Sequence, residues 1–68
     1  MVVTLKAWPM CGKGFATLTR DRLGDDPQEL FRVNRRGTAN VSGLRLAEQA
    51  ARDWAAKNGV EIHEEIFS

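Results

Sequence analysis

Residues 42–59 carry the most regular pattern in the sequence, an apolar repeat at spacings of three and four. This spacing places six apolar side chains on one face of a helix: Leu44, Ala47, Ala50, Ala51, Trp54 and Ala55. Ser42 is a preferred N-cap residue, and Asn58-Gly59 supplies residues that adopt the left-handed conformation at a helix C-terminus. On the opposite face, Glu48 and Arg52 have the spacing of a favourable ion pair. The pattern predicts one amphipathic helix of about four turns.

Three segments before this helix have the composition of β-strands. Residues 2–8 and 15–23 are rich in β-branched and aromatic side chains, and the Pro- and Gly-containing residues 9–14 predict the turn of a hairpin between them. A second turn at residues 23–27 precedes a third strand at residues 30–35, which ends at Arg36-Gly37. The sequence therefore predicts three consecutive strands before the helix.

Strand-like alternation returns after Gly59. Residues 60–67 place Val60, Ile62 and Ile66 on one side of a strand and Glu61, His63 and Glu65 on the other. The predicted order is βββαβ, in one domain spanning residues 1–68. We expect an α+β fold with a three- to four-stranded, mainly antiparallel sheet and the helix on one face.

A single helix covers only one face of such a sheet, so the other face is left to water or to a partner. The side chains expected to face the helix are Val3, Leu5, Ala16, Leu18, Phe31, Val33, Val60 and Ile62. Alternation sends another set to the uncovered side, here called the open face: Lys6, Trp8, Phe15, Thr17, Thr19, Arg32, Asn34 and Arg36. The open face thus combines aromatic side chains with cations.

Charge and cysteine content limit the environment and the partners. Ten basic and nine acidic residues nearly cancel, so the chain lacks the strong overall field that steers a protein onto nucleic acid or an anionic membrane. The single cysteine, Cys11, cannot form an internal disulfide, which favours a reducing compartment. No apolar run approaches the about 20 residues of a membrane span. We expect a cytoplasmic protein that does not bind membranes.

Residues with catalytic chemistry are present without the partners that catalysis needs. Gly12-Lys13-Gly14 lacks the spacing and the following helix of a phosphate-binding loop, and a hairpin turn explains its glycines. Cys11 lies near Lys13, whose charge favours a thiolate, but the base that a catalytic cysteine requires is not evident. We expect a protein that is not an enzyme and uses no cofactor.

The acidic residues around His63 are the candidates for metal binding. Glu61, Glu64 and Glu65 supply carboxylates next to the imidazole, whereas specific sites normally take three or four ligands held by supporting hydrogen bonds. A solvated acidic strand explains the same residues. The sequence predicts no metal site here.

Five arginines in the middle of the chain suggest a binding patch. Strands two and three are expected to bring together Arg20, Arg22, Arg32, Arg35 and Arg36. A cluster of guanidinium groups accepts phosphates, carboxylates or an acidic protein surface, although an ordinary solvated surface also explains it. Trp8 and Phe15 lie beside it on the predicted open face, and Trp and Arg are frequent interface anchors. These seven residues form the predicted partner site.

Two resemblances bear on function. Residues 29–62 resemble the end of a double-stranded-RNA-binding domain, which grips phosphates from its last helix. The resemblance comprises the third predicted strand, the Arg35-Arg36-Gly37 turn and the helix residues 46–55, Leu-Ala-Glu-Gln-Ala-Ala-Arg-Asp-Trp-Ala. That family starts with a further helix and has two lysines at the start of its last helix. The corresponding residues here, 42–45, contain one cation, Arg45. In size and plan, the chain resembles small accessory proteins of bacteriophages and mobile elements, including anti-CRISPR proteins.

These observations lead to two functional hypotheses. The first is a non-enzymatic protein-binding module that docks on a larger bacterial protein or ribonucleoprotein complex through the open face, as a phage-encoded inhibitor of a bacterial defence would in the host cytoplasm. The second is a small nucleic-acid-binding domain that uses the arginine patch. The near-zero net charge favours the first hypothesis, because cations that neutralise phosphates supply most non-specific nucleic-acid affinity. A homodimer is compatible with either.

Overall fold

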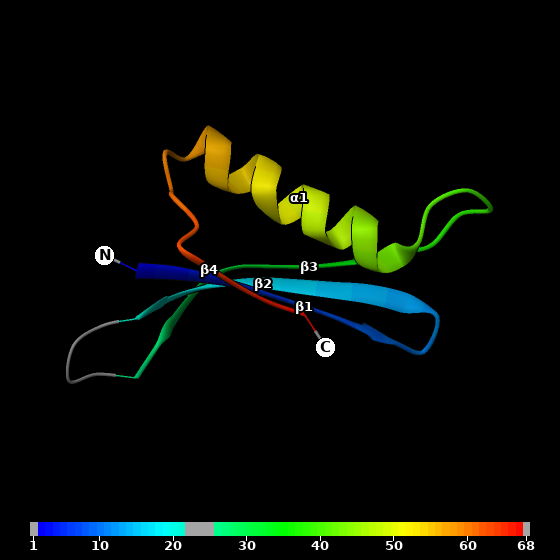
Figure 1. Cartoon of the computed structure of the whole chain (residues 1–68), viewed down its shortest axis with the longest axis horizontal. Helices are drawn as coiled ribbons and strands as arrows, with labels where there is room; N and C mark the ends of the chain where they lie inside the picture. The colour runs from blue at the N-terminus through cyan, green and yellow to red at the C-terminus, as the bar shows by residue number, and fades with distance from the viewer. Residues whose placement is uncertain (1, 22–25, 68) are drawn as a thin grey trace.

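The computed structural model describes residues 2–21 and 26–67 (Figure 1). Its elements are β1 (Val2–Met10), β2 (Lys13–Asp21), β3 (Gln28–Arg36), α1 (Gly43–Lys57) and β4 (Glu64–Phe67). The order βββαβ confirms the predicted α+β fold. The four strands form one mostly antiparallel sheet, and α1 lies along one side of it (Figure 1).

The hairpin between β1 and β2 is tighter than predicted. Met10 pairs with Lys13, so the turn contains only Cys11 and Gly12 rather than six residues. Both turn residues have positive φ, 52° and 76° respectively, as a type I′ turn requires. This turn matches the twist of the flanking strands, which allows them to pair as far as its two ends. Residues 9, 10, 13 and 14 therefore belong to strands.

The strand order is β3-β2-β1-β4, which makes β3 and β4 the two edges. β1 pairs antiparallel with β2, and β2 pairs antiparallel with β3, whereas β4 runs parallel to β1. The β2–β3 register shifts between Leu18, opposite Phe31, and Thr19, opposite Glu29, so that Leu30 is an extra residue in β3. This bulge changes which side of β3 its first residues face.

The predicted ends of α1 are confirmed. The Ser42 side chain accepts a hydrogen bond from the Arg45 N–H at 3.1 Å, as an N-cap does. At the other end Gly59 has φ 65°, and the Val60 N–H donates to the Ala55 carbonyl at 2.8 Å, which satisfies a terminal acceptor. Because both signals are local in sequence, the helix boundaries follow from them directly.

Small residues bring α1 close to the sheet. Ala47, Ala51 and Ala55 are buried against β1, β2 and β3, where Leu5 and Leu18 are fully enclosed. At the rim of this layer Phe31 and Trp54 stack with their ring centroids 5.2 Å apart. The core is one thin layer between helix and sheet, as the apolar stripe predicted.

The last strand is shorter than predicted, and some of its residues face the other side of the sheet from the one predicted. Residues 60–63 are not part of a strand, although Val60 and Ile62 still pack against the core as expected. In β4, Glu65 pairs with the core residue Leu5, so it faces the helix side, and Ile66 lies on the open face. The prediction that Ile66 shares a side with Val60 and Ile62 is wrong, because β4 begins only at Glu64 and the alternation within it does not continue back to Val60 and Ile62.

Candidate functional site

The side of the sheet away from α1 is covered by none of the described elements (Figure 1). Strand pairing arranges its side chains in rows that cross the sheet. One row contains Asn34, Phe15 and Trp8, and the row before it contains Arg32, Thr17, Lys6 and Ile66. A third row, at the hairpin end, contains Arg36, Lys13 and Met10. The predicted membership of the open face is confirmed, and the longer hairpin strands add Met10 and Lys13 to it.

Trp8 and Phe15 form the centre of this surface. They lie directly opposite each other on the two central strands, with ring centroids 5.8 Å apart and ring planes inclined by only 9°. Aromatic cross-strand pairs of this kind stabilise a sheet and restrict both side chains. Both residues are half-buried. The pair therefore presents an ordered apolar surface on the open face.

Four cations surround the aromatic pair, and three acids lie at the far end of the same face. Lys6, Lys13, Arg32 and Arg36 occupy the rows on either side of the stack. Glu29 and Glu64 share the row of Thr19 and Thr4, beyond Arg32 and Lys6, and Asp21 lies in the row after it. Charge on the open face is thus separated along the strand direction. The hairpin end is basic, and the opposite end is acidic.

One of these cations already has a partner. The Arg32 Nε lies 2.7 Å from the Glu29 Oε1, with both side chains largely exposed. Within the described residues, Lys6, Lys13 and Arg36 have no such partner. Sequence alternation did not place Glu29 beside Arg32, because only the bulge at Leu30 returns Glu29 to the open face.

The five arginines of the predicted patch do not form one cluster. Arg32 and Arg36 lie on the open face, while Arg20 pairs with the core residue Val3 and therefore lies on the helix side. Arg35 is also on the helix side, opposite Gly14, and donates to the Asn34 carbonyl at 2.9 Å. Antiparallel pairing puts Arg20 and Arg35 at opposite ends of the strands. Arg22 lies outside the described residues.

Cys11 and His63 are too far apart to act together. Cys11 is exposed at the tip of the β1–β2 hairpin, whereas the His63 N–H donates to the Val3 carbonyl near the start of β1. The length of β1 separates them, about 25 Å at the rise of a strand. The His63 imidazole lies 3.7 Å from the Glu61 carboxylate, and within residues 2–21 and 26–67 no three metal-ligating side chains form a cluster.

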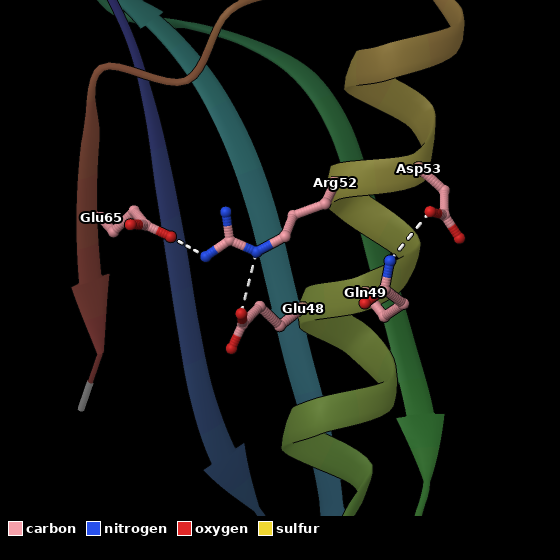
Figure 2. A network of polar contacts seen from close by, with 5 residues as sticks. All are labelled: Glu48, Gln49, Arg52, Asp53 and Glu65. Carbon is pink, nitrogen blue, oxygen red and sulfur yellow. Dashed lines mark hydrogen bonds and ion pairs between the residues drawn. The ribbon is translucent and has the colours of Figure 1, made fainter.

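A second polar feature links the helix to the edge of the sheet. The Arg52 Nε lies 2.9 Å from the Glu48 Oε2, the predicted pair, and the Arg52 Nη2 contacts the Glu65 carboxylate of β4 (Figure 2). Gln49 donates to Asp53 on the outer side of α1 at 2.9 Å. The link from Arg52 to Glu65 could not be predicted, because it depends on β4 pairing with β1.

Comparisons with protein families, curated proteins and solved structures find no match to this chain. In the part of the chain that the structure describes, no helix has the length and apolar character needed to cross a membrane. The candidate site is therefore defined by its own geometry, an ordered aromatic pair within a basic half of an uncovered sheet face.

Proposed function

We propose that this protein is a non-enzymatic binding module that docks the open face of its sheet onto an acidic surface of a larger protein. The observation that carries the proposal is the Trp8–Phe15 stack, which lies uncovered between cations on the two central strands. Trp, Phe, Met and Arg are enriched at the centres of protein interfaces. The same four residue types meet here in the rows around the stack.

The restricted motion of the side chains on this surface favours binding. Association loses affinity when flexible side chains must be immobilised, and a stacked pair on paired strands has already lost that freedom. Met10, half-exposed at the hairpin end, extends the apolar area along β1. A partner that covers the stack and Met10 gains apolar burial at small entropic cost.

Charge separation along the strands supports an acidic partner and a defined orientation. Lys13 and Arg36 are cross-strand neighbours at the basic end, while Glu29 and Glu64 lie at the other. Complementary potentials of this kind increase the association rate and disfavour wrong orientations. Docking on a bacterial defence complex by a phage-type inhibitor is one function that such a face would serve.

Nucleic acid is the rival occupant, since aromatic side chains and cations also bind single strands. Two findings favour protein: the arginines are divided between the two faces, and Arg32 is paired with Glu29. Binding driven by phosphate contacts would weaken steeply as salt rises. Salt dependence therefore distinguishes the two occupants.

The test compares two charge-reversal variants that differ only in the face they alter. Arg32→Glu with Arg36→Glu reverses the open face, and Arg20→Glu with Arg35→Glu makes the same charge change on the helix side. Once affinity capture with the parent has identified a partner, purified partner is expected to bind the first variant about 30-fold more weakly or worse. The second variant is expected to stay within about threefold of the parent.

Two results would contradict the proposal. Equal losses in both variants would show that overall charge, rather than the open face, determines binding. Tight binding of a single-stranded or duplex oligonucleotide by the parent at physiological salt, lost in the open-face variant, would assign the face to nucleic acid. Circular dichroism of both variants establishes that each is folded before binding is compared.

A further inference from the structure

The two edges of the sheet are built differently. β3 is interrupted by the bulge at Leu30, is preceded by Pro27 and carries three arginines, Arg32, Arg35 and Arg36. Bulges, proline and charged side chains are the usual features that prevent an edge strand from pairing with another chain. The β3 edge is therefore protected.

β4 contains neither a bulge nor a proline, and of its two charged residues, Glu64 and Glu65, the second is paired with Arg52. Its four residues, Glu64–Phe67, are all exposed, and the exposed fractions of Ile66 and Phe67 are 40% and 49%. Ile66 lies beside Lys6 on the open face, and Phe67 lies beside Ala7 on the helix side. Both sides of this edge thus end in a large apolar side chain, a combination that edge strands normally avoid.

α1 does not cover β4. The helix packs over β3, β2 and part of β1, and the Arg52 side chain reaches across to Glu65 (Figure 2). This ion pair ties β4 to the helix and leaves its outer edge accessible. The strand is held in place without being shielded.

Backbone direction shows which groups of β4 are available. The His63 N–H points toward β1, where it donates to the Val3 carbonyl at 2.9 Å. Because the backbone groups of alternate residues in a strand point to the same side, those of Glu65 also turn inward. The N–H and C=O groups of Glu64 and Ile66 consequently point away from the sheet, as the unpaired groups of an edge strand do.

We infer that β4 is a second binding site, which accepts an extended segment of a partner protein as a fifth strand of the sheet. Main-chain hydrogen bonds to Glu64 and Ile66 would supply affinity, and side chains of the added strand would cover Ile66 and Phe67. The Glu64 carboxylate selects a cationic residue opposite it. A second copy of β4 fits poorly, because two of its four residues are acidic. This site involves backbone and goes beyond the proposed open-face docking.

The test uses nuclear magnetic resonance of the ¹⁵N-labelled full chain with a synthetic seven-residue peptide of alternating valine and lysine. We expect shift changes concentrated in Glu64–Phe67 and the adjacent residues of β1, and slower hydrogen exchange of the Glu64 and Ile66 amides. The matched peptide of alternating valine and glutamate is expected to bind about tenfold more weakly, because it places like charges opposite each other.

Two substitutions at one position separate backbone from side chain. Ile66→Pro removes an outward N–H, which edge strands tolerate, and is expected to weaken peptide binding by about tenfold or more. Ile66→Ala keeps the N–H and is expected to bind more tightly than Ile66→Pro. Equal binding by the two variants, or exchange rates of the Glu64 and Ile66 amides unchanged by saturating peptide, would overturn the inference.

The open-face variant Arg32→Glu with Arg36→Glu provides the remaining comparison. It is expected to keep its affinity for the cationic peptide, because β4 is the opposite edge of the sheet. Loss of peptide binding in this variant would place the peptide on the open face and refute the β4 site. Failure of the peptide to bind the parent would also refute it, and would leave the open-face proposal intact.

Discussion

Gly14 of β2 faces the start of α1, and replacing it with alanine tests how the helix is held on the sheet. A Cβ atom at this position would lie well inside van der Waals contact with the backbone of Gly43 and Leu44. The atoms it meets are main chain, which no side-chain rotation can move. The first turn of α1 would have to shift by about 1 Å or more to restore normal contact.

Two effects of opposite sign determine how Gly14→Ala changes the free energy of unfolding. Alanine is favoured over glycine within a strand by about 0.5–1 kcal/mol, which alone predicts a more stable protein. Overpacking against rigid neighbours costs about 3 kcal/mol, at the upper end of its usual range because backbone must move. The expected net loss is about 2 kcal/mol, which corresponds to a fall in Tm of about 8–16 °C for a domain of this size.

Thermal unfolding followed by circular dichroism measures this loss, with Gly12→Asn as the control. Gly12 has φ 76°, which asparagine tolerates, and a Cβ there meets nothing within 4 Å. Gly12→Asn should therefore cost only the backbone strain of a left-handed residue, about 1 kcal/mol or less for asparagine, and clearly less than Gly14→Ala. If Gly14→Ala were as stable as the parent or more so, strand propensity would outweigh the contact, and the close approach of α1 would be refuted.

Four further experiments test other parts of the structure. Ala51→Asp should leave the protein largely unfolded at 25 °C by circular dichroism, since a buried unpaired carboxylate costs several kcal/mol; a near-parental melt would refute the assigned core. Ser42→Ala should cost about 1 kcal/mol in urea unfolding, and no change would argue against the cap. A double-mutant cycle of Arg52→Ala and Glu65→Ala should give a coupling below about 1 kcal/mol that decreases in high salt, because both side chains are partly exposed. Trp8→Ala should weaken partner binding about tenfold or more, and unchanged affinity would remove the stack from the interface.

The open face shows where sequence reasoning succeeds. Alternation alone assigned Trp8 and Phe15 to the same side of the sheet, and pairing places them directly opposite each other. It assigned Arg32 and Arg36 to that side as well, because each lies in a regular part of β3. Side-chain direction is a property of consecutive residues, so it can be predicted without knowledge of the partner strand.

The residues that were missed depend on how strands meet. Met10 and Lys13 were assigned to a turn, because a cysteine before a glycine gives little indication that both residues have positive φ. Glu29 reaches the open face through a bulge that no local pattern marks. Arg20 and Arg35 were grouped with the open-face arginines by proximity in sequence, although both lie on the helix side.

Local signals in the sequence were sufficient to predict α1 from cap to cap, the order of the elements and the side of the sheet that most strand residues face. Each of these depends on residues within a few positions of one another, where capping, periodicity and alternation operate. Four features could be recognised only in the folded chain: the tight β1–β2 hairpin, the parallel pairing of β4 with β1, the bulge that brings Glu29 to Arg32, and the contact of Arg52 with Glu65. The last three depend on contacts between strands or between helix and strand, and register between strands is set by such contacts rather than by local preference.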